Sequence, residues 1–155
     1  FSLRAWAFFA KYSPFLPIGF LVNLGCKRKL SKAEQAAYQR PFTKKNSLAG
    51  ARVLPGWIPT NSKNLHAIRG QNIWSKLGKM DIPVATLFSD GDPFTRGAEK
   101  YIIRNIPGSK NQKHKIISGG HFLQEDSAKE IANFLKDFAQ SLFQPYLPND
   151  SKKPN

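Results

Sequence analysis

The stretch Pro83-Val84-Ala85-Thr86-Leu87-Phe88-Ser89-Asp90-Gly91-Asp92 decides the fold class of this chain. Its first six residues form a continuous apolar run between turn residues, which is typical of a strand buried on both faces of a parallel sheet. A helical pattern follows, and Pro107-Gly108 ends it before a second strand, which we expect within residues 113–118. The apolar residues of this helical pattern are Ala98, Tyr101, Ile102 and Ile106. Strand, helix and strand in this order predict one βαβ unit and an α/β fold.

The remainder of the chain has helical patterns. A capping box, Ser127-Ala128-Lys129-Glu130, predicts the start of a closing helix after the second strand. Residues 144–155 lack any periodic apolar face, so we expect a disordered tail there. The helices expected before the first strand are Phe1–Tyr12, Ile18–Leu24, one begun by the capping box Ser31-Lys32-Ala33-Glu34, one over residues 46–54 that Pro55-Gly56 closes, and Asn64–Leu77.

The composition indicates a globular chain with a strongly basic charge. Its 155 residues are 41% hydrophobic, and 24 Lys+Arg against 10 Asp+Glu give a formal net charge of +14. Such a field attracts polyanions. The basic residues are dispersed, however, and their densest runs are Lys27-Arg28-Lys29 and Lys44-Lys45. We therefore expect neither nucleic acid nor a membrane as a partner, and keep a non-catalytic basic binding module as the alternative of another class.

Cysteine and hydropathy patterns narrow the chemistry further. The single cysteine, Cys26, cannot form an internal disulfide, and no Cys or His spacing indicates a metal site. The apolar segment Phe15–Leu24 is interrupted by Pro17 and is shorter than the roughly 20 residues of a membrane span. We expect no metal, no cofactor and no transmembrane helix, and a cytoplasmic location is the default.

Two side chains follow the two expected strands and point to acid–base chemistry. Asp92 comes just after the first strand, and His121, in Ser118-Gly119-Gly120-His121-Phe122, comes just after the second, 121 − 92 = 29 residues later. This is how an α/β-hydrolase supplies the last two members of its catalytic triad. Asp90 competes with Asp92 for the acid position, because Asp-Gly-Asp-Pro is also an ordinary turn sequence. His66 and His114 lack such a context.

The motifs together resemble those of the haloalkane dehalogenases, from Phe1 to about Ala139. The resemblance implies a partial α/β-hydrolase fold: a helical cap and return to the core over residues 1–80, then the last βαβ unit and C-terminal helix of the parallel sheet over residues 81–143. The segments that carry it are Leu3-Arg4-Ala5-Trp6, Leu30-Ser31-x-x-Glu34-x-x-Ala37-Tyr38-x-x-Pro41-Phe42, Ala49-Gly50-Ala51-Arg52, Phe88-Ser89-Asp90-Gly91-Asp92-Pro93 and Gly119-Gly120-His121-Phe122-Leu123-Gln124-Glu125. Epoxide hydrolases share this architecture and similar late motifs.

The resemblance implies hydrolysis of a carbon–halogen bond without a cofactor, through an alkyl ester on an enzyme carboxylate. His121 would act as the general base and Asp92 would orient it. No nucleophile turn occurs in these 155 residues and the chain opens at Phe1, so we expect the C-terminal part of a longer enzyme, inactive alone. The alternative enzyme is an epoxide hydrolase or other cap-bearing α/β-hydrolase, which would use cap tyrosines such as Tyr12 or Tyr38.

Trp6 is the halide-binding residue that the resemblance implies, because an indole N–H is a donor-only group suited to stabilising a departing anion. The alternative is that Trp6 only packs in an amphipathic helix. A second residue that donates a hydrogen bond to the halide is expected beside the missing nucleophile. Trp57 and Trp74 are interpreted as structural. The expected partners are a haloalkane, water and the halide ion, and the complete protein is expected to be a monomer.

Overall fold

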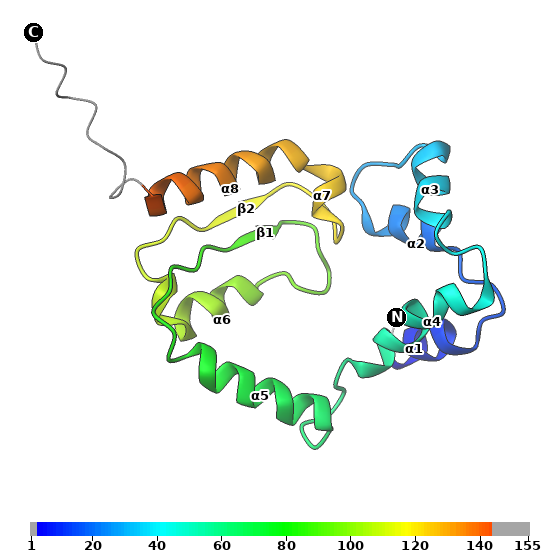
Figure 1. The fold of residues 1–155 in the computed structure, drawn as a ribbon, viewed down its shortest axis with the longest axis horizontal. Coiled ribbons are helices and arrows are strands. Elements are labelled where there is room, and N and C mark those ends of the chain that lie inside the picture. Colours follow the sequence, from blue (N-terminus) through cyan, green and yellow to red (C-terminus); the bar gives the residue numbers. More distant parts are fainter. Residues whose placement is uncertain (1–2, 144–155) are drawn as a thin grey trace, which may run out of the picture. The chain divides into compact units, whose positions relative to one another are not determined.

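The structure is a computed structural model that describes residues 3–143, and the predicted tail over residues 144–155 lies outside them. The chain divides into two compact units, Phe1–Met80 and Asp81–Asn155. Figure 1 shows the first unit built from helices, and the second with two neighbouring strands drawn between helices. The elements of the first unit are α1 (Leu3–Tyr12), α2 (Ile18–Gly25), α3 (Lys32–Gln39), the 3₁₀ turn η1 (Lys45–Leu48), α4 (Ala49–Trp57) and α5 (Leu65–Leu77).

The helices expected over residues 18–24 and 64–77 are confirmed, but the predicted stop at Pro55 is wrong. Pro55 lies inside α4, which continues to Trp57. A proline lacks one backbone N–H and so removes one hydrogen bond to the preceding turn. Because Pro55 lies in the last turn of this nine-residue helix, only the final three residues lie at or beyond the lost bond, and the helix tolerates it.

Close backbone approach joins α2 to α3. A Cβ atom built on Gly19 would lie 2.0 Å from the carbonyl oxygen of Gln35, which no real side chain tolerates. The Gly19 N–H also lies 3.4 Å from the Gln39 side-chain oxygen. Val22 and Leu30 are buried at 6% and 4% exposure. Glycine at position 19 therefore lets the two helices pack in contact.

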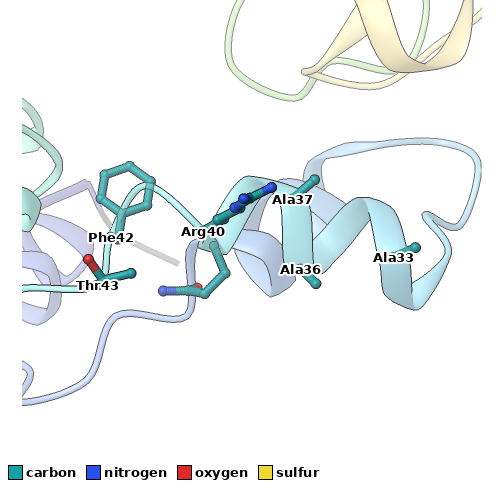
Figure 2. A pocket seen from close by; sticks show the side chains of 7 residues that line it. Ala33, Ala36, Ala37, Arg40, Phe42 and Thr43 are labelled. Carbon is teal, nitrogen blue, oxygen red and sulfur yellow. The ribbon is translucent and has the colours of Figure 1, made fainter.

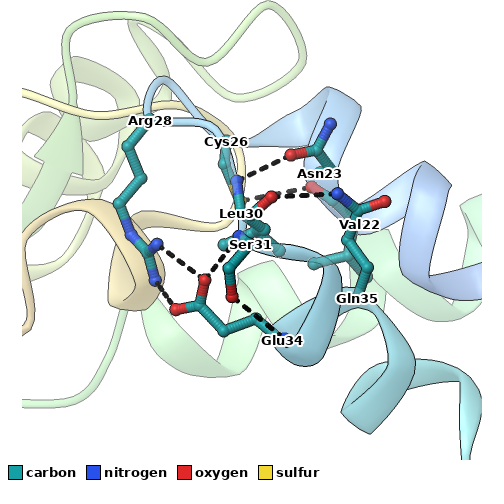
Figure 3. Close-up of polar contacts among 8 residues, drawn as sticks. All are labelled: Val22, Asn23, Cys26, Arg28, Leu30, Ser31, Glu34 and Gln35. Atoms are coloured by element: carbon teal, nitrogen blue, oxygen red, sulfur yellow. Dashed lines mark hydrogen bonds and ion pairs between the residues drawn. The ribbon is translucent and has the colours of Figure 1, made fainter.

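The predicted capping box at the start of α3 is confirmed, and an ion pair extends it (Figure 3). The Ser31 hydroxyl accepts from the Glu34 N–H at 3.2 Å, and the Glu34 carboxylate accepts from the Ser31 N–H at 2.7 Å. Arg28 donates to both carboxylate oxygens of Glu34, at 2.7 and 3.2 Å. The Arg28 hydrogen bonds first, and then those of Ser31, lower the pKa of Glu34 to about 2.

Arg52 of α4 binds the C-terminal end of α1 in the first unit. Its guanidinium donates to the carbonyl oxygens of Ala10 and Lys11, both at 3.3 Å, and of Ser13 at 2.6 Å. Carbonyls at a helix C-terminus have no partner within the helix and carry partial negative charge. The arginine of the Ala49-Gly50-Ala51-Arg52 motif therefore caps α1 from a neighbouring helix.

The second unit confirms the βαβ unit and the α/β class. Strand β1 (Leu87–Ser89) pairs in parallel with β2 (Lys115–Ile117), with Phe88 opposite Ile116, and the intervening chain forms α6. In Figure 1 the two strands run side by side between α6 and α8. The other elements are α6 (Ala98–Asn105), the 3₁₀ turn η2 (Pro107–Ser109), α7 (Leu123–Asp126) and α8 (Ala128–Phe143).

The first strand is shorter than predicted. Only Leu87–Ser89 pair with β2, each with one of the three residues Lys115–Ile117. Earlier in the predicted strand, the Val84 N–H donates to the Gly108 carbonyl at 2.9 Å and not to a residue of β2. Burial on both faces is also not reached within residues 3–143, where Phe88 is half-buried and Ile116 is 56% exposed. The apolar run fixed the strand's place in the chain, whereas its length depends on the paired strand.

Several large apolar side chains are exposed in both units, including Phe8 at 67% and Phe94 at 73%. Single exposed apolar residues are common on protein surfaces, but contiguous ones mark surfaces that contact other molecules. Among residues 3–143, no helix combines the length and the apolar character needed to cross a membrane.

Candidate functional site

The candidate site lies where the two parallel strands of the second unit end. Ser89 is the last residue of β1 and pairs with Ile117, the last residue of β2. Because the carboxyl ends of parallel strands meet at the same edge of a sheet, the loops that carry Asp92 and His121 leave side by side. The alternation of strand and loop thus brings together two residues that are 29 positions apart, at a sheet edge where α/β proteins place their ligands.

Asp92 is a buried carboxylate with three donors directed at it. His121 Nδ1 lies 3.2 Å from Oδ1 and 3.1 Å from Oδ2, and the Phe94 N–H donates to Oδ1 at 2.9 Å. The Thr95 hydroxyl donates to Oδ2. Asp92 is only 4% exposed, so these groups replace the water that would otherwise solvate the charge.

The surroundings of Asp92 favour its ionised form. Burial raises the pKa of the carboxyl group, but the hydrogen bonds from Thr95, Phe94 and His121 lower it by more in sum, so the pKa lies below its usual range. Asp92 is therefore a carboxylate at neutral pH and accepts the Nδ1–H of His121. A carboxylate that holds Nδ1–H leaves Nε2 as the basic nitrogen of a neutral imidazole.

The His121 ring lies between two phenylalanines. Phe94 and Phe122 each meet it edge to face, with ring centroids 5.1 Å apart in both pairs. The side chain of His121 is 40% exposed, and within residues 3–143 its Nε2 has no hydrogen-bond partner. The arrangement presents one imidazole nitrogen for proton transfer while the carboxylate and both rings restrict the ring's rotation.

Asp90, the competing acid, holds the backbone of the neighbouring loop. Its Oδ1 accepts from the Gly119 N–H at 3.0 Å, and the Gly91 N–H donates to the Gly119 carbonyl at 3.0 Å. A Cβ on Gly91 would lie 2.5 Å from that carbonyl oxygen, so only glycine fits between the two loops. Of the two carboxylates, the structure places Asp92 against His121.

Trp6 lies in α1 of the first unit, half-buried, with its ring 5.8 Å from that of Phe9. Trp57 stacks on His66, with ring centroids 5.7 Å apart.

His114 has a structural role between β1 and η2. Its Nδ1 accepts from the Thr86 N–H at 3.2 Å, and its Nε2 lies 2.9 Å from the Ser109 carbonyl oxygen. A carbonyl only accepts and a backbone N–H only donates, so the neutral ring must carry its proton on Nε2. Both ring nitrogens are thus used in joining the ends of the βαβ unit.

A surface pocket of about 710 Å³ lies on α3 and the loop after it (Figure 2). It is lined mostly by small and uncharged side chains, and Arg40 is the one ionisable residue in its lining. No carboxylate, imidazole or thiol side chain is among its lining residues. In the described part of the chain, no cluster of three or more His, Cys, Asp or Glu side chains is arranged to hold a metal ion. The lining residues are Ala33, Ala36, Ala37, Gln39, Arg40, Phe42 and Thr43.

Sequence reasoning did not identify Thr95 and Asp126 as neighbours of the site. Thr95 donates to Asp92, and Asp126 accepts from the Gly120 N–H at 2.7 Å. The spacing from Asp92 to Thr95 has a signal that sequence reasoning can use, because aspartates in turns bond groups two and three residues later. Asp126 has no such signal, since its partner belongs to another segment.

Comparisons with known proteins place the chain among close relatives over most of its length. It is 36% identical over 141 residues to a haloalkane dehalogenase of Mycolicibacterium paratuberculosis, with 91% of this chain and 47% of that protein aligned. The haloalkane dehalogenase of Mycobacterium marinum is 39% identical over 84% of this chain and 44% of its own length. That of Psychrobacter cryohalolentis is 37% identical over 88% and 46%. No protein-family model matches the chain.

A solved structure supports the same fold. The tetrameric haloalkane dehalogenase DpaA from Paraglaciecola agarilytica has a TM-score of 0.72 against this structure, at 21% sequence identity, over 90% of this chain and 46% of that one. This likeness confirms the expected partial α/β-hydrolase fold with a helical cap. The chain spans about half the length of the curated relatives it matches.

Proposed function

Since the chain belongs to the haloalkane dehalogenase family, we propose that it supplies the base and cap of an enzyme that hydrolyses carbon–halogen bonds. The observation that carries the proposal is the contact of His121 Nδ1 with a buried Asp92 carboxylate, at 3.1 Å. This pair supplies the general base and its orienting acid, and the nucleophilic carboxylate comes from polypeptide outside residues 1–155.

The proposed reaction has two steps. First, a carboxylate oxygen forms a bond to the substrate carbon while the carbon–halogen bond breaks, and halide leaves with the electron pair. Water then attacks the ester carbonyl and gives a proton to Nε2 of His121. The acyl C–O bond breaks, the alcohol leaves with the proton that His121 returns, and the regenerated carboxylic acid loses its proton to solvent. His121 works in the second step alone.

Asp92 supports His121 in this scheme through charge. As water gives up its proton, the imidazole becomes a cation, and a buried carboxylate in contact with Nδ1 stabilises it. The hydrogen bonds that lower the pKa of Asp92 keep the negative charge available at neutral pH. Asp92 therefore acts on the rate through His121.

Trp6 is proposed to donate a hydrogen bond to the halide. Its indole N–H donates only, and a donor that stabilises the departing anion accelerates the displacement step. Small haloalkanes and water are the proposed substrates. The relative with the solved structure is a tetramer. For this protein a monomer is the proposal, with the cytoplasm as the default location.

The test measures halide release from short bromo- and chloroalkanes by the complete gene product that carries this chain. His121→Gln should lower kcat about a hundredfold or more, because general-base catalysis contributes that much. Asp92→Asn should lower it about a hundredfold or more. His66→Gln and Asp137→Asn are the matched controls and should retain activity.

Trp6→Phe tests the halide role separately. It should lower halide release about a hundredfold, the typical effect of removing one donor to a developing anion. Trp57→Phe, which also removes an indole N–H, should leave release unchanged. Absence of release by the unaltered protein, with turnover of an epoxide instead, would transfer the function to the epoxide hydrolases that share this architecture.

A further inference from the structure

Two more carboxylates hold the loop that carries His121. Asp90 Oδ1 accepts from the Gly119 N–H at 3.0 Å, and Asp126 Oδ2 accepts from the Gly120 N–H at 2.7 Å. Both amide groups lie within two residues of His121. Hydrogen bonds to carboxylates are shorter and about twice as strong as those between neutral groups, so these two contacts fix the loop firmly.

One of these carboxylates precedes the His121 loop in the sequence and the other follows it. Asp90 follows β1, whereas Asp126 is the last residue of α7, which comes after the loop. The Gly119 carbonyl also accepts from the hydroxyl of Ser89. A Cβ on Gly119 would lie 2.4 Å from Cδ1 of Leu123 and 3.2 Å from Cβ of Asp126, so a larger residue there would require the Leu123 side chain of α7 to shift.

We propose that Asp90 and Asp126 are positioning residues that set where the imidazole of His121 stands against Asp92. Glycine has the greatest backbone freedom of any residue, and the loop enters His121 through the two consecutive glycines at 119 and 120. Without the two acceptors, the N–H groups of both glycines lose their hydrogen-bond partners. A displacement of about 1 Å is enough to slow a reaction about a hundredfold.

The inference rests on the proposed function for its kinetic consequence. Halide leaves before His121 acts, so a displaced His121 slows only ester hydrolysis. Asp126→Ala should lower kcat about ten- to a hundredfold, while a rapid first release of one halide per enzyme molecule remains and KM falls. Asp126→Asn keeps an acceptor oxygen and should recover most of kcat. The same pattern is expected for Asp90→Ala and Asp90→Asn.

A spectroscopic readout tests positioning without any substrate. The Nδ1–H proton of His121, held by Asp92, should give a far-downfield proton NMR signal in the complete gene product, assigned by its loss in His121→Gln. Asp90→Ala and Asp126→Ala should broaden or abolish this signal. The Asn variants, and the control Asp137→Ala on the exposed face of α8, should keep it.

The outcomes separate the two claims. Loss of the signal in the alanine variants, with no haloalkane turned over by any version, supports the positioning roles and overturns the proposed function. A wild-type signal and an unchanged ratio of first release to steady state in both alanine variants overturn the positioning roles. If the alanine variants do not fold, Asp126→Glu replaces them, since it keeps the charge but moves the oxygen by one methylene. A shifted signal and lower kcat then support the proposal, and wild-type values overturn it.

Discussion

Thr95→Val should destabilise the protein through Asp92 alone. The substitution keeps the shape of the side chain but removes the hydroxyl that donates to Oδ2 of Asp92. Asp92 is 4% exposed, so water has little access to replace the lost donor. The Phe94 N–H still donates to Oδ1 at 2.9 Å, so the charge keeps part of its solvation.

The magnitude follows from the type of bond that is lost. A hydrogen bond to a charged group contributes about 1.5–3 kcal/mol to stability. We therefore expect the free energy of unfolding of Thr95→Val to fall by about 2 kcal/mol at pH 7, a change of about thirtyfold in the unfolding equilibrium. Urea unfolding of the complete gene product measures it. Thr60→Val, at an exposed position of the first unit, should stay within about 0.5 kcal/mol of wild type.

The loss of stability in Thr95→Val should depend on pH, in a direction set by the pKa of Asp92. Its pKa in the folded protein lies below the ordinary value of 3.8, so its contribution to stability is fully present above that value and is lost as the pH falls through the folded-state pKa. The difference between Thr95→Val and wild type should therefore shrink in acid. Equal stability of the two proteins at pH 7, or a deficit that persists unchanged in acid, would refute the anchoring of a charged Asp92 by Thr95.

Two further predictions concern the first unit. Gly19→Ala should lower the free energy of unfolding, measured in urea, by about 2 kcal/mol or more, because its Cβ would lie 2.0 Å from a backbone oxygen of α3. In the control Gly50→Ala the new Cβ has nothing within 4 Å, so this variant should stabilise α4 by about 0.5–1 kcal/mol. A similar loss of stability in both variants would contradict the close approach of α2 and α3. NMR titration should give Glu34 a pKa of about 2, and Arg28→Ala should raise it toward the ordinary 4.5; an unchanged value in the variant would show that the ion pair does not form in solution.

Local patterns in the sequence predicted what local interactions decide. The capping box at Ser31 was predictable because both of its hydrogen bonds join residues three apart. The capping box predicted at Ser127 was wrong, because the Ser127 hydroxyl donates instead to the Ser118 carbonyl at 2.6 Å. The βαβ order was predictable because the apolar run and the helical pattern have different periods. The loops after the strands were therefore also predictable as the site's location.

Interactions between distant segments decided the rest. The continuation of α4 past Pro55 and the three-residue length of β1 depend on neighbouring elements that no local pattern reveals. The sequence left Asp90 and Asp92 as alternatives because both lie in one turn. Only the geometry of the two loops separates the carboxylate that meets His121 from the one that meets the Gly119 backbone.

The most direct measurement is intact-mass spectrometry of the His121→Gln form of the complete gene product after mixing with a short bromoalkane. If Asp92 and His121 form the base that hydrolyses an alkyl ester, one halide should leave per enzyme molecule and the protein should gain the mass of one alkyl group. The unaltered protein should release halide continuously and show no such gain. Continuous turnover by His121→Gln without any mass gain would contradict the account.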